Sequence, residues 1–531
     1  MERKEDTGCG VLWKRVKRKN DRLVLEGICG VKLPKGTGRP DLSKFQICIR
    51  RGDDDPGKTK FHWVKGLPFL KGYRLRRFSW EIPLTDAVDM DIQNKLDLYY
   101  GDLWLGDFNY DILSRRVGDY RNTRPVRWMG QALYFRQTIH NKIWFVVRPE
   151  NIYDRPWHRF RVFCAWALSR VLGDADYVLM FEKESSRYEE SASVLYEELV
   201  DSGYTNVRYI LNKDNLQIPR MKPQYRRYLV AKDSFKHLLC FFRAKKFVGT
   251  ENIDHAMQLR AANRHLMTKM QSTDLTQVFL QHGVMYMVSL DAENRVFFQN
   301  HDLNMYRAVV SSEAEAMHFV LLGGFSRKDM YVTGLAKFDR SIRRDNAELI
   351  MIMPTWRRWE VNLAQKDFES TGYYQMLQRI VNGIPEHLRD RIVVKPHPLM
   401  EKMMQSHETE LTKYLRPELS HNDTLERTRL LITDYSSIAY DAFYRGSNVV
   451  FYWEDKEECM RNYGNAHLMI NEHNIFGDIC YSEDQLTRAV EKNYDQEQQP
   501  LYRRRYERIV AFHDNRNTQR IIEKLKEDGI I

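Results

Sequence analysis

Hydroxyl groups and a carboxylate lie together in residues 433–437, TDYSS, between two short apolar runs. The runs, LLI at 430–432 and NVVFYW at 448–453, are apolar almost throughout, which is typical of parallel strands that helices cover on both faces. The residues between them fit a short helix that ends at Gly446. The segment therefore predicts a strand, a turn, a helix and a second strand, with the polar residues in the first turn.

The position of this turn suits an anionic ligand. It leaves the carboxyl end of a parallel strand, where open α/β sheets bind ligands, and the following helix begins with free N–H groups. We predict that Ser436 and Ser437 bind a phosphate, with Thr433 and Asp434 beside them and Asp441 one turn further along the helix. In the alternative interpretation, Asp434 or Ser436 only caps the helix.

Two further loops at predicted strand ends carry cationic or titratable side chains. In KPHP, prolines restrict the backbone on both sides of His397, and Lys395 precedes them. In PTWRR, Thr355, Arg357 and Arg358 follow an apolar strand. Because arginine binds phosphate with two parallel hydrogen bonds, this loop suits a diphosphate. In the alternative interpretations, His397 is a structural histidine and PTWRR is a solvated loop.

A second histidine lies in FLQHG. His282 ends another apolar strand, and Gly283 permits a close approach of the backbone. A neutral imidazole, with an ordinary pKa of ~6.5, accepts a proton from a hydroxyl at physiological pH. We predict that His282 is a general base. The acidic pairs at 89–91 and 174–176 are weak candidates for a metal site, and loop or capping roles suit them better.

The pattern of the sequence changes near residue 150. Residues 1–150 contain short alternating stretches separated by turns, which predicts an antiparallel, immunoglobulin-like β-sandwich. Apolar strands then alternate with helical segments. This predicts two doubly wound domains facing one another across a cleft, at 155–345 and 346–490, followed by a helical brace at 491–531.

The composition is moderately basic, with 83 Lys and Arg against 72 Asp and Glu, a net charge of +11. This excess suits nucleic acid, an anionic membrane or a phosphate-rich substrate, and basic clusters at 14–19 and 502–508 could contact lipid headgroups.

No apolar run reaches ~18 residues and the first residues are charged, so we expect a cytoplasmic protein without a transmembrane helix. The 7 scattered cysteines fit reduced thiols.

The loop motifs, taken together, resemble one known family. PTWRR, KPHP and TDYSSIAYD are similar, in order and spacing, to motifs of the CDP-glycerol glycerophosphotransferase family, the teichoic acid and capsule polymerases and primases of bacteria. FLQHG resembles its His-Gly motif, TGLAKFD its G-x-P-R-x-D segment, and FEKESSRYEESASVLYEEL its N-terminal βα unit. The resemblance covers residues 155–490. Val284, Met285 and Tyr286 follow the His-Gly pair where the family has Thr and a basic stretch, and Ala336 and Lys337 replace Pro and Arg.

The resemblance implies a GT-B fold of two Rossmann-like domains. It implies transfer of glycerol phosphate or ribitol phosphate from a CDP-alcohol to a hydroxyl of a teichoic acid or capsule-type acceptor, with release of CMP. His282 would be the general base and His397 the second catalytic histidine. The residues that would bind the donor are Thr355, Arg357, Arg358, Lys395, Thr433, Asp434, Ser436, Ser437 and Asp441.

No cofactor is expected to be required, and the need for a divalent metal stays open. We expect peripheral attachment to the inner face of the cell membrane, a lipid-linked or polymeric acceptor, and no nucleic-acid partner. Two alternatives belong to other classes. A nucleotide-sugar glycosyltransferase of cell-surface polysaccharide synthesis would share the fold, and a non-enzymatic protein that binds nucleic acid or membrane would use only the positive charge.

Overall fold

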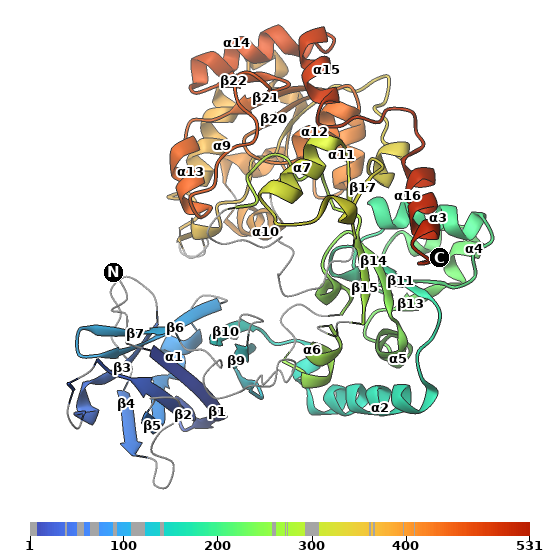
Figure 1. Ribbon diagram of the computed structural model, residues 1–531. Coiled ribbons are helices and arrows are strands. Elements are labelled where there is room, and N and C mark those ends of the chain that lie inside the picture. The colour runs from blue at the N-terminus through green and yellow to red at the C-terminus, as the bar shows by residue number, and fades with distance from the viewer. Residues whose placement is uncertain are drawn as a thin grey trace. The chain divides into compact units, whose positions relative to one another are not determined.

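The structure is a computed structural model that describes residues 8–34, 36–37, 40–49, 58–63, 74–88, 93–107, 123–137, 143–257, 262–270, 272, 274–291, 307–360, 363–364, 367–396, 398–407 and 409–531. They form two compact units (Figure 1). Unit 1 comprises Met1–Ala175, Asp233–Ala244 and Met257–Leu275. Unit 2 comprises Asp176–Lys232, Lys245–Ala256 and Thr276–Ile531.

Unit 1 contains two antiparallel sheets. The first has the order β1 (Gly8–Lys19), β2 (Arg22–Lys32), β5 (Arg74–Pro83), β4 (Lys58–Trp63). The second has the order β3 (Phe45–Ile49), β6 (Gln93–Tyr100), β10 (Ile143–Pro149), β9 (Gln131–Gln137), β8 (Val126–Trp128), and β7 (Leu103–Asp107) pairs with β6. Leu25 and Trp80 of the first sheet share one hydrophobic core with Ile47 and Phe135 of the second. The immunoglobulin-like sandwich stays a prediction.

Helices complete unit 1. They are α1 (Leu84–Val88), α2 (Pro156–Leu172), α5 (Phe235–Arg243) and α6 (Arg264–Met270). Pro156 begins α2 at a position that needs no intrahelical N–H donor, and Gly173 ends it with φ 70°, which glycine adopts without strain. Both α5 and α6 pack against α2.

Unit 2 contains two sheets, and every pairing within them is parallel. The seven-stranded sheet has the order β13 (Leu229–Ala231), β12 (Val207–Leu211), β11 (Val178–Phe181), β14 (Lys246–Gly249), β15 (Thr276–Phe279), β16 (Arg307–Val310), β17 (Met330–Val332). The five-stranded sheet has the order β19 (Ile392–Val394), β18 (Leu349–Ile352), β20 (Thr428–Thr433), β21 (Asn448–Tyr452), β22 (Asp478–Cys480). The prediction of an α/β fold with parallel sheets is confirmed.

The helices of unit 2 follow these strands along the chain. They are α3 (Ser191–Asp201), α4 (Pro223–Arg226), α7 (Glu313–Leu321), α9 (Gly372–Asn382), α10 (Pro398–His407), α11 (His421–Arg427), α12 (Ile438–Tyr444), α13 (Lys456–Asn462), α14 (Glu483–Tyr494), α15 (Pro500–Glu507) and α16 (Asn517–Glu527). Among the residues that the structure describes, no helix has both the length and the hydropathy needed to cross a membrane.

The inner strands of the five-stranded sheet, β18, β20 and β21, are buried on both faces. In β18, Met351 belongs to a hydrophobic cluster that also includes residues of the seven-stranded sheet, while Ile350 and Ile352 belong to a second cluster with α9 and α14. Successive side chains of a strand point to opposite faces, so a strand covered on both faces must be apolar at every position. This explains the continuous apolar runs in the sequence.

The chain after β22 contacts both sheets of unit 2. Helix α14 packs on β21 and β22, whereas α16 packs on α3 and on the 3-10 helix Ala336–Arg340. Asp528, just after α16, lies 2.7 Å from Arg307 of β16, and Asp339 accepts a hydrogen bond from the backbone N–H of Thr518 at 2.7 Å. The C-terminal helices therefore tie the two sheets together.

Candidate active site

A cavity of about 740 Å³ lies in unit 2 where loops from both parallel sheets meet. Loops after β11, β14 and β15 of the seven-stranded sheet and after β18 and β20 of the five-stranded sheet contribute to its lining. Five of the predicted site residues line it, namely His282, Thr355, Ser436, Ser437 and Asp441. The carboxyl ends of the strands therefore bring together residues that are far apart in the sequence.

The His-Gly loop after β15 approaches the TDYSS loop closely. Gln281 has a left-handed backbone, with φ 59°, and its side-chain amide donates to the carbonyl oxygen of Val309 at 2.6 Å. This bond fixes the turn just before His282. A Cβ atom on Gly283 would lie 3.1 Å from the Oγ of Ser437, closer than most such contacts. Glycine at position 283 therefore permits the approach.

The imidazole of His282 has a carboxylate neighbour. Its Nδ1 lies 3.5 Å from Oε1 of Glu251, which follows β14, and the side chain of His282 is 41% exposed against 11% for Glu251. Burial raises the pKa of Glu251, and the nearby His282 opposes that rise. A carboxylate beside Nδ1 favours the proton on that nitrogen and leaves Nε2 as the basic one. This arrangement suits a general base.

A lysine joins the two loops. The Nζ of Lys337 lies 2.5 Å from Oδ1 of Asp441, and it also donates to the carbonyl oxygen of His282 at 2.8 Å. Lys337 belongs to TGLAKFD and lines the cavity. The sequence marked it only as a departure from the family pattern, so its role in the site was missed.

The lining carries both signs of charge. Two arginines of the lining have acidic neighbours, since Arg340 lies 2.5 Å from Glu197 and Arg187 lies 3.7 Å from Glu190. Lys183 also lines the cavity. The cavity can therefore offer cations to phosphate oxygens and carboxylates to hydroxyl groups.

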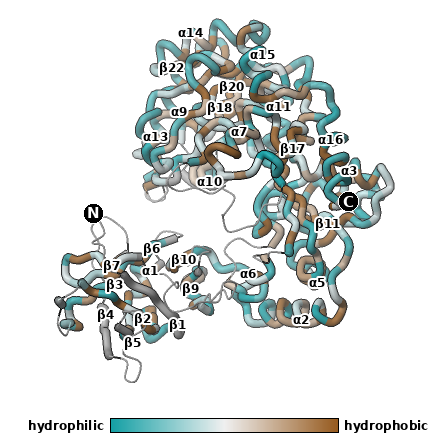
Figure 2. Tube along the Cα trace, viewed as in Figure 1, coloured by the Kyte–Doolittle hydropathy of each residue, from teal (hydrophilic) through white to brown (hydrophobic). Residues whose placement is uncertain are grey.

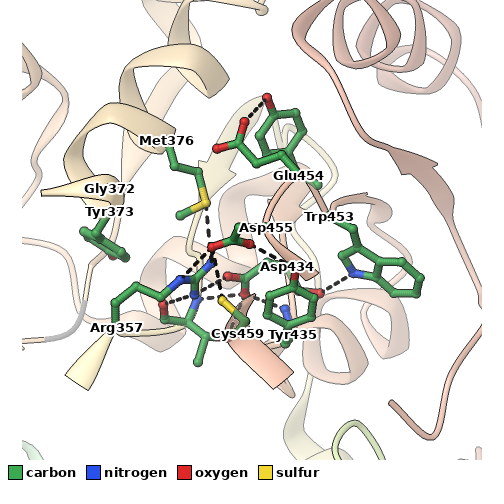
Figure 3. A network of polar contacts seen from close by, with 12 residues as sticks. Arg357, Gly372, Tyr373, Met376, Asp434, Tyr435, Trp453, Glu454, Asp455 and Cys459 are labelled. Atoms are coloured by element: carbon green, nitrogen blue, oxygen red, sulfur yellow. Dashed lines mark hydrogen bonds and ion pairs between the residues drawn. The ribbon is translucent and has the colours of Figure 1, made fainter. Parts of the chain in front are cut away.

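Arg357 does not line the cavity. Its guanidinium lies between two carboxylates, 2.7 Å from Oδ2 of Asp434 and 2.8 Å from Oδ2 of Asp455, with Met376 and Cys459 close by (Figure 3). Burial opposes its charge, but Asp434 and Asp455 outweigh burial and hold the pKa of Arg357 well above the ordinary value.

This ion-pair network positions a residue of the cavity. The other oxygen of Asp434 accepts from the backbone N–H of Thr355 at 2.8 Å and from its hydroxyl at 2.6 Å. Arg357 also donates to the carbonyl oxygen of Thr355 at 2.6 Å. The PTWRR loop is thus anchored rather than solvated. A direct contact of Arg357 with the donor stays a prediction that this geometry does not support.

Residues 163–527 match the family model described as CDP-Glycerol:Poly(glycerophosphate) glycerophosphotransferase, which covers more than half of the chain. The chain belongs to this family. The predicted resemblance is confirmed.

Individual relatives are more distant. The chain is 21% identical over 547 residues to the minor teichoic acid biosynthesis protein GgaB of Bacillus subtilis (strain 168), an alignment that covers 97% of this chain and 55% of GgaB. The chain thus spans about half the length of this curated relative. A structure of the wall teichoic acid polymerase TagF matches with a TM-score of 0.47 and 16% identity, over 70% of this chain and 98% of that one. A structure of UDP-GlcNAc 2-epimerase from Neisseria meningitidis bound to UDP-GlcNAc matches with a TM-score of 0.39 and 11% identity. This match covers 66% of this chain and 99% of that one.

Lys395 and Thr433, two further predicted donor-binding residues, are buried as Arg357 is. The ammonium of Lys395 donates to the carbonyl oxygens of Arg416 and Leu419 at 2.6 and 2.5 Å, and burial lowers the pKa of Lys395. The hydroxyl of Thr433 donates to the carbonyl oxygen of Met353 at 2.7 Å. Neither side chain lines the cavity, so their predicted contact with the donor lacks support from the geometry.

Four predicted site residues remain to be placed, and their positions differ. The hydroxyl of Ser436 accepts from the N–H of Ile438 at 3.4 Å, while Ser437 immediately precedes α12 and its side chain makes no capping hydrogen bond. Arg358 begins a 3-10 helix, and its side chain is not described. His397 lies outside the described residues.

The acidic pairs at 89–91 and 174–176 are the metal candidates of the sequence. Asp176 forms an ion pair with Lys246 at 2.9 Å, and residues 89–91 lie outside the described ranges. Within the described residues, no three His, Cys, Asp or Glu side chains come together as a metal site.

Proposed function

We propose that the protein transfers glycerol phosphate or ribitol phosphate from a CDP-alcohol to a hydroxyl of a teichoic acid or capsule-type acceptor and releases CMP. One observation carries the proposal: in a chain of the glycerophosphotransferase family, His282, Ser437, Lys337 and Asp441 face one cavity. A CDP-alcohol donor is supported by the family description, which names CDP-glycerol. The teichoic acid acceptor is supported by the name of GgaB.

In the proposed reaction, His282 takes the proton of the acceptor hydroxyl while the oxygen attacks the phosphorus that carries the alcohol. A new phosphodiester bond forms, and the bond from that phosphorus to the bridging oxygen breaks. CMP leaves with the bridging oxygen. General-base assistance typically contributes ~10²- to 10⁴-fold to the rate. Glu251, close to Nδ1, offsets the positive charge that develops on the imidazole.

The other residues hold the donor. The hydroxyls of Ser436 and Ser437 donate to phosphate oxygens, and Lys337 supplies a positive charge beside them. Asp441 accepts a hydrogen bond from the alcohol of the donor. Arg357 acts indirectly, because its ion pair with Asp434 fixes the loop that carries Thr355. Phosphoryl transfer needs such positioning and charge stabilisation more than covalent help from the protein.

We further propose peripheral attachment to the anionic inner face of the cell membrane. The expected acceptor is lipid-linked or polymeric, and a lipid-linked acceptor would bring the active site close to lipid. The net charge of +11 supports an attraction to anionic headgroups.

Release of CMP from competing donors tests the proposed function. The purified chain is incubated with a soluble polyol-phosphate primer and with CDP-glycerol, CDP-ribitol or a UDP-sugar. We expect CMP from at least one CDP-alcohol and no reaction with the UDP-sugar. Transfer of sugar from the UDP-sugar, without release of CMP from either CDP-alcohol, would identify a nucleotide-sugar glycosyltransferase instead.

A further inference from the structure

Lys183 is a cation of the active-site cavity that the protein itself does not pair. It follows β11 in the sequence, and its half-buried side chain lines the cavity. Within the part of the chain that the structure describes, its ammonium makes no hydrogen bond and has no carboxylate oxygen within 4.0 Å. An ammonium that has lost part of its hydration is stabilised by an anion beside it. A bound ligand can supply that anion.

The other four lysine and arginine side chains of the lining already have partners. Three of them pair with carboxylates, and the fourth donates a hydrogen bond to a side-chain amide. These pairs are Lys337 with Asp441, Arg340 with Glu197, Arg187 with Glu190, and Arg445 with Asn422. Among these five cations, Lys183 is therefore the one that can bind a ligand anion without breaking a contact of the fold.

The loop that carries Lys183 has a strained backbone. Strand β11 is apolar at every position (Figure 2), and the polar residues 182–185 follow it directly. Glu184 and Ser185 are both left-handed, with φ 52° and 51°. This conformation is costly for residues other than glycine and persists where neighbouring contacts impose it. The N–H of Glu184 donates to Nδ1 of His255 at 3.2 Å, and the hydroxyl of Ser185 donates to the carbonyl oxygen of His255 at 3.0 Å.

Glu182 fixes the start of the same loop. Its carboxylate is fully buried and accepts three backbone hydrogen bonds, of 2.8 to 3.0 Å, from residues 189, 190 and 193 at the start of α3. Burial raises the pKa of Glu182 to about 7, although these bonds oppose the rise. The loop is therefore anchored on both sides of Lys183, which presents its ammonium to the cavity from a fixed backbone.

Lys183 lies on the same side of the cavity as the proposed base. Burial raises the pKa of Glu251, and the positive charges of His282 and Lys183 both oppose that rise. The two cations are thus neighbours of one carboxylate, which follows a strand of the seven-stranded sheet. Ser436 and Ser437, which face the donor phosphates in the proposed reaction, follow a strand of the five-stranded sheet. An anion at Lys183 therefore belongs to the acceptor rather than to the donor.

We propose that Lys183 binds a phosphate of the acceptor, next to the hydroxyl that His282 deprotonates. The acceptor is then a chain in which phosphodiesters link polyol or sugar units, and an uncharged glycan is a poor acceptor. Lys183 acts in the choice of acceptor and has no part in binding the donor. The inference rests on the proposed function, because it names the acceptor of the same site.

Binding of a soluble acceptor tests Lys183 without any turnover. The probe is a synthetic trimer of glycerol phosphate, and its control is the same trimer with each phosphodiester capped as a neutral methyl ester. Both are titrated calorimetrically into the full chain with saturating CMP, which occupies the donor side. We expect the charged trimer to bind at least about tenfold more tightly, because a hydrogen bond between two charged groups is stronger than one to a neutral ester.

Variants at two lysines isolate the residue. Lys183→Gln should weaken binding of the charged trimer about tenfold and leave the affinities for the neutral trimer and for CDP-glycerol unchanged. Lys183→Arg keeps the charge and should restore most of the affinity. Lys213→Gln removes an exposed lysine of unit 2 that does not line the cavity, and it should bind both trimers as the native chain does. The thermal unfolding temperature of each variant checks the fold.

Three results would overturn the inference. The first is equal affinity of the native chain for the two trimers, and the second is native affinity of Lys183→Gln for the charged trimer. The third is a loss of affinity of Lys183→Gln for CDP-glycerol, which would assign the lysine to the donor. Release of CMP is measured separately. A chain that binds the charged trimer through Lys183 but releases no CMP from either CDP-alcohol would support this site and contradict the proposed function.

Discussion

The Nζ of Lys337 lies 2.5 Å from Oδ1 of Asp441, and both side chains are nearly buried, at 12% and 7% exposed. Lys337 follows a strand of the seven-stranded sheet, whereas Asp441 lies on α12 beside the five-stranded sheet. The same ammonium donates to the carbonyl oxygen of His282. One lysine thus links the His-Gly loop to the TDYSS helix, and the geometry between the proposed base and the donor depends on it.

Lys337→Met should therefore lower the rate of CMP release by about 100-fold, because small displacements of reacting groups cost factors of that size. Lys337→Arg keeps the charge and should retain much more activity. Rates of CMP release at saturating donor make the comparison, with circular dichroism to check folding. A folded Met variant with the native rate would show that the link has no role in catalysis.

His282→Ala should abolish transfer while leaving donor affinity nearly unchanged, since a general base makes its decisive contribution in the transition state. Ser437→Ala should weaken donor binding as well as turnover, because a group that contacts phosphate acts in the ground state too. Calorimetric titration of CDP-glycerol or CDP-ribitol, alongside CMP release, separates the two effects. His397→Ala is predicted to resemble Ser437→Ala. If His282→Ala loses donor affinity and His397→Ala keeps it, then His397 is the general base and His282 binds the donor.

The parallel sheets and the polar loops could be predicted because their signals are local in the sequence. A strand buried on both faces needs a continuous apolar run, and the ligand loop follows it directly, as β20 and residues 433–437 do. His282, Ser436 and Ser437 were each found from such a neighbourhood. Their presence in one cavity follows from the carboxyl ends of the strands meeting at one edge of each sheet.

The partners of these residues could not be predicted, because they are distant in the sequence. Arg357 looked like a loop arginine, and only the fold brings Asp455, 98 positions away, within 3.0 Å of its Nε. Lys337 and Glu251 likewise reach His282 from other strands.

Arg357→Gln is expected to destabilise the protein more than it weakens donor binding. The substitution leaves Asp434 and Asp455 without their cation, and breaking a buried ion pair typically costs about 3–5 kcal/mol. Chemical denaturation measures the free energy of unfolding. Arg503→Gln, at an arginine that is 51% exposed, is the control and should change stability by less than about 0.5 kcal/mol. Native stability combined with a loss of donor affinity would instead support direct contact of Arg357 with the donor.

The free energy of unfolding should decrease as the pH falls, because the buried His318 resists protonation in the folded protein. His318 packs against the His-Gly loop, through Met285. Burial lowers its pKa from 6.5 to about 4. The ring is neutral in the fold, with Nδ1 donating to the carbonyl oxygen of Met285 at 2.9 Å and Nε2 accepting from the N–H of Leu290 at 3.3 Å. Between pH 6.5 and pH 4 the unfolded chain binds a proton that the folded chain does not. The contribution of the neutral His318 to the free energy of unfolding is therefore fully present above pH 6.5, and it is lost as the pH falls to about 4.

Urea unfolding of native chain and His318→Gln between pH 7.5 and pH 4 measures this contribution. The native chain should lose up to about 3 kcal/mol more than the variant over that range, because each pKa unit corresponds to about 1.4 kcal/mol. His387→Gln, at an exposed histidine, controls for the general effect of acid on carboxylates. Equal pH dependence of His318→Gln and the native chain would rule out this histidine as the titrating group.

Gly283→Ala should slow transfer by pushing the His-Gly loop away from α12. The added Cβ would lie 3.1 Å from the Oγ of Ser437 and 3.7 Å from its Cβ, so the hydroxyl is the atom that must move. We expect a loss of CMP release of about tenfold or more, given the sensitivity of rates to such displacements. When Gly283→Ala is made in the Ser437→Ala background, it should reduce the rate of CMP release much less, because the Oγ of Ser437 is absent. Rates of the native chain, both single variants and the double variant give this coupling directly. An equal cost of Gly283→Ala in both backgrounds would mean that contact with Ser437 does not constrain the loop.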